Sequence, residues 1–118
     1  QTVKLDSNFI SRDENERKKY DEDPLNYRGG SKPGWVNQFD KAGGWMRKNA
    51  KLFTHTVMVN YSPSDKVVYA QASEDFYNNI SSTEKKLEIY DGLYHELLKE
   101  IEKAEVMQKM LEWCQSQL

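Results

Sequence analysis

Apolar residues recur at three- and four-residue spacings between Trp35 and Phe53, and this spacing predicts an amphipathic helix. Two adjacent glycines, Gly43 and Gly44, fall in the middle of the pattern and weaken the helix. The polar positions of the same stretch are mildly basic, which is typical of a solvated helix face. We therefore expect one amphipathic helix here, with its apolar side packed.

The pattern then changes to strands that alternate with helices. HTVMVNY is a short β-branched run without helical period, and it predicts a buried strand. YAQASEDFYNNI returns to helical spacing, and the polar NNISST is expected to end that helix. KKLEIYDG predicts a second strand, which ends at Asp91-Gly92.

The segment after the second strand predicts one long helix, because a single apolar stripe runs to the end of the chain. The residues of this stripe are Leu97, Ile101, Ala104, Met107, Leu111, Cys114 and Leu118. Since Cys114 falls on the stripe, we expect it to be a packed, unreactive thiol. The tryptophans of this helix and of the earlier one are expected to fill a core, and they are Trp35, Trp45 and Trp113.

A strand, a helix and a second strand in this order predict a parallel pair joined by a right-handed crossover. Two strands are too few for a stable parallel sheet, because such sheets are covered on both faces. The fold class is therefore α/β, with the order helix, strand, helix, strand, helix, and the chain is interpreted as one end of a larger sheet.

The first 34 residues are polar and contain most of the turn signals. Ser11 or Asp13 is expected to cap a short polar helix that runs toward Tyr20, and Asp23-Pro24 to end it. Charged side chains of both signs are mixed along this stretch. A solvated surface is the expected result.

Composition narrows the function classes. The chain has 118 residues, enough for one small domain, and a formal net charge of −2, so no overall field attracts nucleic acid or an anionic membrane. No apolar run approaches the roughly 18 residues that span a bilayer. A single cysteine excludes an internal disulfide, and two histidines without a matching ligand cluster argue against a metal site. The start at Gln1, without a methionine or a signal-peptide pattern, favours a processed product or a fragment.

Two residues with candidate chemistry follow the two predicted strands. Asp65 lies in YSPSDKVV after the first strand, and His95 lies in YDGLYHE after the second. The carboxyl ends of neighbouring parallel strands share one edge of a sheet, so the two side chains should meet there. Such an acid can accept the Nδ1 proton of the imidazole, which then acts as a general base. The alternatives are that His95 is an ordinary loop residue and that Asp65 caps the following helix.

The nucleophile for such a pair is not evident in the chain. No G-x-S-x-G turn is present. The serines near the pair lie in loops or on the crossover helix, and we do not expect any of them to be a nucleophile: Ser62, Ser64, Ser73, Ser81 and Ser82. His55 precedes a strand without a nearby partner, and we interpret it as a structural or surface residue.

The stretch ASEDFYNNISSTEKKLEIYDGLYHELLKE resembles the closing segment of the monoacylglycerol lipase and lysophospholipase group of α/β-hydrolases. In that group a strand, a histidine loop similar to GLYHEL and a final helix end the fold. Upstream, LDSNFISRD, YDEDPLNYRGG and WVNQFDKAGGWMRKNAKLF are similar to the end of the family's cap region and the helix that returns the chain to the sheet. The resemblance covers nearly the whole chain, and the histidine loop is its most specific part.

Carried over residue by residue, the resemblance makes Asp65 the acid and His95 the base of a catalytic triad. Gly92 matches the turn glycine before the histidine, and Glu96 the acidic residue after it. The family's usual His-Gly pair before the acid is replaced here by Tyr61-Ser62. A serine fits this position only if its backbone has ordinary dihedral angles.

The resemblance implies the C-terminal portion of an α/β-hydrolase fold, with residues 1–34 as the end of the cap and residues 35–118 as core. It implies a serine ester hydrolase that acts on a monoacylglycerol or lysophospholipid and needs no cofactor, in which Trp35 and Trp45 could line an acyl entrance. The partner is the remaining N-terminal part of the hydrolase, without which the chain is expected to be inactive. The location implied is cytoplasmic, with peripheral membrane contact through the cap left open. The alternative is a non-catalytic, hydrolase-derived interaction module that pairs with another chain through its free strand edge.

Overall fold

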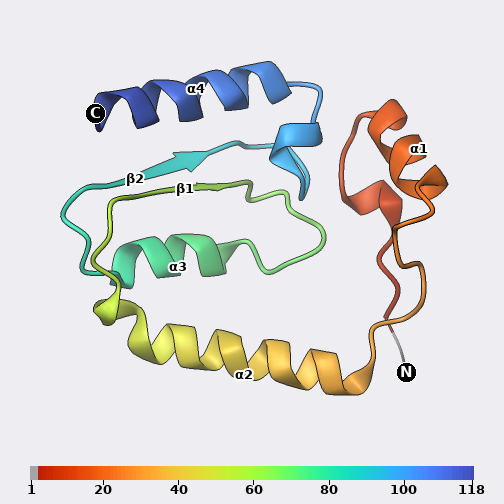
Figure 1. Ribbon diagram of the computed structural model, residues 1–118, viewed down its shortest axis with the longest axis horizontal. Helices are drawn as coiled ribbons and strands as arrows, with labels where there is room; N and C mark the ends of the chain where they lie inside the picture. Colours follow the sequence, from red (N-terminus) through yellow and green to blue (C-terminus); the bar gives the residue numbers. More distant parts are fainter. Residues whose placement is uncertain (1–2) are drawn as a thin grey trace.

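The computed structural model describes residues 3–118, and its helices and strands follow one another in the predicted order (Figure 1). The α-helices and strands are α1 (Glu14–Glu22), α2 (Pro33–Asn49), β1 (Val57–Tyr61), α3 (Gln71–Asn79), β2 (Lys85–Ile89) and α4 (Lys103–Ser116). Three short 3-10 helices lie between them: η1 (Ser7–Phe9), η2 (Ala50–Leu52) and η3 (Leu97–Lys99).

The two strands form a parallel pair, as predicted, and α3 is the crossover between them. The register runs from Val57 opposite Lys85 to Tyr61 opposite Ile89. Figure 1 shows α4 on one side of the strands and α3 with α2 on the other. In the described chain β1 pairs only with β2, so its second edge has no partner strand. Four of the five residues of β1 are half-buried and only Tyr61 is buried, so the prediction of a buried strand is wrong for most of its length.

The short polar helix is confirmed as α1. Asp13 is its cap, and its side chain accepts a hydrogen bond from the Asn15 N–H at 2.9 Å. The helix ends at Glu22, just before Asp23-Pro24. An ion pair connects α1 with the start of α4, because Lys103 Nζ lies 3.2 Å from a Glu16 carboxylate oxygen.

Helix α2 begins with Pro33 at its first turn and continues through the two glycines at 43 and 44 without a break. It ends at Asn49, where the chain tightens into η2, earlier than the predicted end at Phe53. Trp35 and Trp45 are 59% and 65% exposed in this chain, so the prediction that they fill a core is wrong here. Trp35 instead stacks on Phe39, with ring centroids 5.2 Å apart.

The last helix begins later than the apolar stripe predicted. Residues Leu97–Lys99 form η3, and Glu100 has extended dihedral angles, so α4 starts only at Lys103. The Glu100 side chain is fully buried and accepts backbone hydrogen bonds from outside the helix. A helix through Glu100 would carry this carboxylate away from those donors, which explains the interruption.

The small core of the described chain packs α4 against the end of β2. Tyr90, Leu93 and Val106 are buried together, with Leu97 and Met110 beside them. This face of α4 is rotated from the predicted stripe. Stripe residues are exposed in this chain, including Met107, Leu111 and Cys114, so the prediction of a packed cysteine is wrong here. Apolar residues occupy more than one face of α4, and periodicity alone selected the wrong one.

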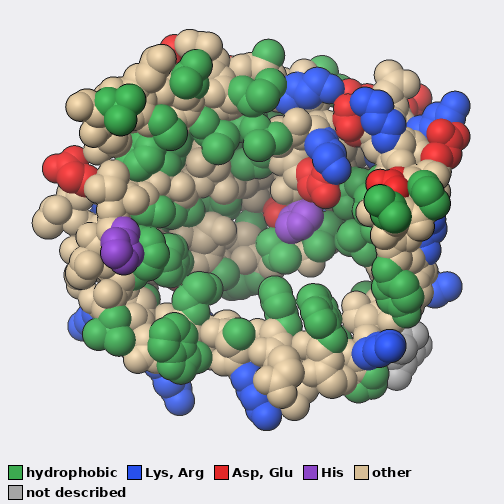
Figure 2. Space-filling view, viewed as in Figure 1, with side chains coloured by type: hydrophobic (Ala, Val, Ile, Leu, Met, Phe, Trp, Pro, Cys, Tyr) green, Lys and Arg blue, Asp and Glu red, His purple; other side chains and the backbone are tan. Residues whose placement is uncertain are grey.

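The overall shape is open. The radius of gyration is 16.0 Å, whereas a compact domain of this length would have about 13–14 Å. The accessible surface is 8470 Å², against about 6,700 Å² expected for a compact monomer of this mass. Figure 2 shows a hollow between α2 and the layer that contains the strands, with hydrophobic side chains along its walls. No helix among residues 3–118 is long and apolar enough to cross a membrane.

Candidate active site

The parallel strand pair brings the two predicted site residues to the same edge of the sheet. Asp65 lies in the loop after β1, and His95 lies in the loop after β2. His95 Nδ1 is 2.8 Å from Asp65 Oδ2, which is hydrogen-bond distance. The expected meeting of the two side chains is therefore observed. An Nδ1–H donated to this carboxylate leaves Nε2 without a proton and able to accept one.

Backbone hydrogen bonds orient the Asp65 carboxylate. Its Oδ1 accepts from the N–H groups of Val67 at 2.7 Å and Val68 at 3.1 Å, which leaves Oδ2 for the imidazole. These two donors belong to the loop before α3, and α3 begins only at Gln71. The alternative that Asp65 caps the crossover helix is therefore wrong. Its side chain is 11% exposed, and that of His95 is 33% exposed, so the pair lies at the surface of this chain with the carboxylate on the inner side.

Two serines connect the acid loop to the histidine loop. The buried Ser62 hydroxyl donates a hydrogen bond to the Leu93 carbonyl and accepts one from the Ser64 N–H. The Ser64 hydroxyl accepts in turn from the Gly92 N–H at 3.2 Å. Apart from glycines, no residue among 3–118 has a positive φ, so Ser62 meets the condition that its backbone be ordinary. Gly92 has φ +83°, as its place in the turn requires.

Neither hydroxyl forms a hydrogen bond with the imidazole in the described chain. In the described chain, the His95 ring is hydrogen-bonded to Asp65 and to no serine. The expectation that the nearby serines are not nucleophiles remains a prediction. The connecting role of Ser62 and Ser64 was not predicted from the sequence. The S-P-S-D spacing is a signal only for the local bond from the Ser64 N–H to the Ser62 hydroxyl, because the two bonds to the histidine loop join residues far apart in the sequence.

A charged contact also joins the two loops. Lys66, the residue after Asp65, places Nζ 4.6 Å from the ring centroid of Tyr94, the residue before His95. A lysine at this distance from an aromatic face is attracted by the ring's negative π-surface. Sequence reasoning could not find this contact, because its partners are loop residues whose directions no periodicity predicts.

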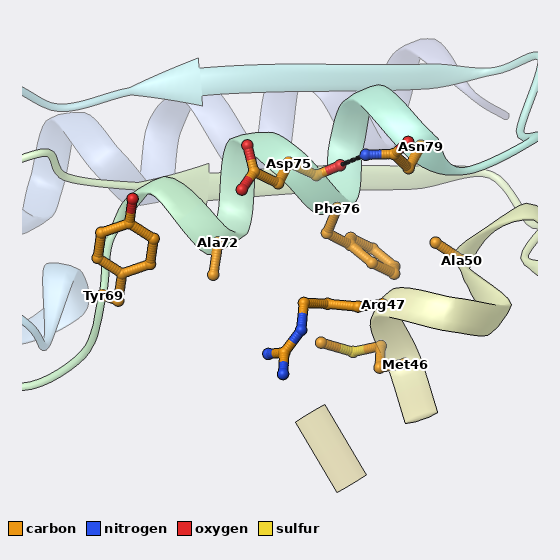
Figure 3. A pocket seen from close by; sticks show the side chains of 8 residues that line it. All are labelled: Met46, Arg47, Ala50, Tyr69, Ala72, Asp75, Phe76 and Asn79. Atoms are coloured by element: carbon orange, nitrogen blue, oxygen red, sulfur yellow. Dashed lines mark hydrogen bonds between the residues drawn. The ribbon is translucent and has the colours of Figure 1, made fainter. Parts of the chain in front are cut away.

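A cavity of about 440 Å³ lies between the end of α2 and α3 (Figure 3). It is lined by Met46, Arg47, Ala50, Tyr69, Ala72, Asp75, Phe76 and Asn79. Figure 3 shows these side chains on the end of α2 and on α3, which face each other, with Ala50 from η2 and Tyr69 from the loop before α3. Neither Asp65 nor His95 lines this cavity, so it is separate from the candidate site. A smaller cavity of about 370 Å³ reaches Asp65 from the α3 side.

The other histidine lies away from this site. His55 is exposed just before β1, and its ring meets Phe53 edge-on with centroids 5.5 Å apart. This agrees with its interpretation as a structural or surface residue. In the described residues, no group of three or more His, Cys, Asp or Glu side chains gathers to hold a metal ion.

Comparison with known proteins identifies the family of the chain. The model of the family described as "Serine aminopeptidase, S33", a group of hydrolases, matches residues 1–102. The chain belongs to the serine aminopeptidase S33 family. Among curated relatives, this S33 chain is 27% identical over 114 residues to a monoacylglycerol lipase of Mycolicibacterium smegmatis, covering 97% of the chain and 41% of that protein. It is also 30% identical over 93 residues to caffeoylshikimate esterase of Arabidopsis thaliana, covering 76% of the chain and 28% of that esterase.

Solved structures confirm the α/β-hydrolase fold of this S33 chain. The monoacylglycerol lipase of Paleococcus ferrophilus superimposes with a TM-score of 0.78 at 23% identity, over 96% of the chain and 45% of that protein. A soluble variant of Saccharomyces cerevisiae monoglyceride lipase, solved with a substrate analogue, superimposes with a TM-score of 0.84 at 20% identity. The match covers 100% of this chain and 44% of the lipase. The resemblance to monoacylglycerol lipase-type hydrolases is thus confirmed. The S33 chain spans less than half the length of each of these lipases.

Proposed function

We propose that this chain contains the acid and the base of a serine hydrolase that cleaves carboxylic esters, with Asp65 orienting His95. The observation that supports this most directly is the 2.8 Å contact between His95 Nδ1 and Asp65 Oδ2 at the carboxyl ends of parallel strands. A loop histidine without a catalytic role would need no carboxylate oriented by two backbone N–H groups.

The nucleophilic serine lies outside this chain in our proposal, on a G-x-S-x-G turn of the remaining part of the hydrolase. We call the polypeptide that contains both parts the intact hydrolase. The serine attacks the ester carbonyl while His95 Nε2 takes its proton, and Asp65 stabilises the resulting imidazolium. His95 then gives this proton to the leaving alcohol. Water, deprotonated by the same nitrogen, releases the acid from the serine and restores its hydroxyl.

The proposed substrate is the ester of a monoacylglycerol or lysophospholipid. The names of two lipases that the chain resembles support the lipid class. The hydrophobic walls of the hollow in Figure 2 also support an apolar acyl chain. We further propose that residues 1–34 end the cap, where the enzyme would make any peripheral membrane contact, and that residues 35–118 belong to the catalytic core.

The 118-residue chain by itself is proposed to be inactive. A base and its orienting acid cannot replace the nucleophile and the donors that stabilise the oxyanion. The open shape supports this proposal, because the hollow and the free edge of β1 would be covered in a larger sheet.

The test begins with the reading frame upstream of the Gln1 codon and the expression of the intact hydrolase. A fluorophosphonate probe and an ester assay then compare His95→Ala with His55→Ala, the other histidine of the chain. We expect His95→Ala to lose about 10³-fold or more in kcat and to abolish labelling, and His55→Ala to stay within about twofold. Wild-type turnover in His95→Ala would overturn the proposal.

The unpaired edge of β1 favours one alternative, a non-catalytic module that binds another chain by strand pairing. A start codon directly before Gln1, together with a defined oligomer of the short chain and no ester hydrolysis, would support the module.

A further inference from the structure

Glu100 is a fully buried carboxylate that the proposed mechanism does not use. Its Oε1 accepts a hydrogen bond from the Tyr94 N–H at 2.6 Å. The Arg12 N–H lies 3.2 Å from Oε1 and 3.3 Å from Oε2, and Arg12 Nε donates to Oε2 at 3.1 Å. A buried carboxylate is costly unless donors satisfy it, and here backbone and guanidinium donors do so.

These donors come from two segments that are distant in the sequence. Arg12 and Glu100 are 88 positions apart. Arg12 lies in the segment before α1, whereas Tyr94 directly precedes His95. The same segment holds the peptide on the other side of the histidine, because the Glu96 N–H donates to the Ile10 carbonyl at 2.8 Å. The backbone on both sides of His95 is therefore fixed to residues 10–12, through Glu100 in one case and directly in the other.

A third bond connects the same elements. The buried Ser11 hydroxyl donates to the Lys99 carbonyl at 2.8 Å, next to Glu100. Arg12 also pairs with Glu102 through its guanidinium, and this hydrogen bond raises the pKa of Arg12. The guanidinium thus stays charged, with its Nε directed to Glu100 and its end directed to Glu102.

We propose that Glu100 is a positioning residue for the catalytic base: it fixes the Tyr94 peptide to Arg12 and so sets where the His95 ring meets Asp65. This inference rests on the proposed function. It adds that the segment before α1, which we assign to the end of the cap, determines the placement of the base. Loss of Glu100 would free one side of the His95 backbone while the Asp65 loop, held by its own N–H donors, stays in place.

The test uses Glu100→Gln in the intact hydrolase. The amide has one acceptor oxygen where the carboxylate uses two, so it cannot serve both Tyr94 N–H and Arg12 Nε. We expect kcat per fluorophosphonate-titrated site to fall about tenfold or more, with KM within about twofold, because misplacing a catalytic group slows the chemical step. We also expect the NMR signal of the His95 Nδ1 proton to move upfield as its bond to Asp65 lengthens.

The matched control is Glu102→Gln. It removes an ion pair from the same Arg12 but makes no contact with the histidine loop, so kcat and the His95 signal should stay close to wild type. The inference is overturned if a folded Glu100→Gln variant matches Glu102→Gln in both kcat and the NMR signal of the His95 Nδ1 proton. If Glu100→Gln does not fold, Arg12→Met serves instead, since it keeps the main-chain donors and loses Nε. A kcat and a His95 signal equal to those of Glu102→Gln would then overturn the inference.

Failure of this inference and failure of the proposed function give different results. An active His95→Ala variant contradicts the proposed function, whatever Glu100 does. An inactive His95→Ala, together with Glu100→Gln that behaves like its control, contradicts only the positioning role.

Discussion

The Ser62 hydroxyl donates a hydrogen bond to the Leu93 carbonyl, and this bond connects the end of β1 to the loop that leads to His95. The hydroxyl is buried and also accepts from the Ser64 N–H. Ser62→Ala therefore leaves a buried carbonyl without its donor. We expect the free energy of unfolding to fall by about 1–3 kcal/mol, measured by urea denaturation of the intact hydrolase.

The control for this prediction is Ser81→Ala. Ser81 is exposed, and its hydroxyl has no hydrogen bond within the described chain. Its replacement should change the free energy of unfolding by less than about 0.5 kcal/mol. Equal effects of the two substitutions would show that the Ser62–Leu93 bond contributes nothing.

Asp65→Asn should reverse the histidine tautomer. The asparagine oxygen would keep the hydrogen bonds from Val67 and Val68, which turns its NH₂ toward His95 Nδ1. Nδ1 must then accept, so the ring proton moves to Nε2, where it blocks proton transfer from the nucleophile. In serine triads this change lowers kcat by about 10⁴-fold.

Asp91→Asn is the matched control, since Asp91 is exposed in the turn before the histidine. We expect it to keep wild-type kcat in the same ester assay. A small effect of Asp65→Asn, comparable with that of Asp91→Asn, would contradict the role of Asp65.

Replacing Gly92 and Gly34 by alanine should change the stability of the protein in opposite directions. A Cβ added at either position meets nothing within 4 Å, so packing does not distinguish them. Gly92 has φ +83°, and alanine there should cost about 1 kcal/mol. Gly34 lies in the first turn of α2, where alanine should stabilise by about 0.5 kcal/mol. Thermal unfolding of both variants measures the two effects. A shift of the unfolding temperature in the same direction for both would refute the conformational explanation.

Glu88 makes part of the stability depend on pH. Its carboxylate lies 2.9 Å from Lys109 Nζ, which connects β2 to α4, and this hydrogen bond lowers the pKa of Glu88. Because the pKa is lowered in the folded state, the stabilisation is complete above the unfolded pKa of about 4.5. This stabilisation is lost as the pH falls through the lower pKa that Glu88 has in the folded state.

Glu88→Gln should therefore be less stable than wild type near pH 7 by about 1 kcal/mol, and the difference should shrink below about pH 4.5. Chemical denaturation at a series of pH values measures it, with the exposed Glu84→Gln as control. A difference that stays constant from pH 7 to pH 3 would exclude the ion pair as its cause.

The sequence predicted the order of elements, the parallel pair and the meeting of Asp65 with His95, because strand patterns and the shared edge of parallel strands determine them. It did not predict the start of α4. The buried Glu100 interrupts the helix through bonds to Arg12 and Tyr94, and no local pattern contains such distant partners.

The burial of apolar helix residues was the other feature that the sequence did not predict correctly. Trp45 and Cys114 lie on apolar helix faces, so the sequence predicted that they are packed. In this chain both are exposed. Periodicity identifies a face that avoids water, but it does not say which segment covers that face.

The bonds from residues 10–12 to the histidine loop also bear on folding. Arg12 and Glu100 are 88 positions apart, so their contact closes a long loop and forms only once the chain between them is organised. The Glu96 amide donates to the Ile10 carbonyl across the same loop, so exchange of its hydrogen with solvent requires that loop to open again. The region around His95 would therefore be among the last to form and would report on the integrity of almost the entire chain.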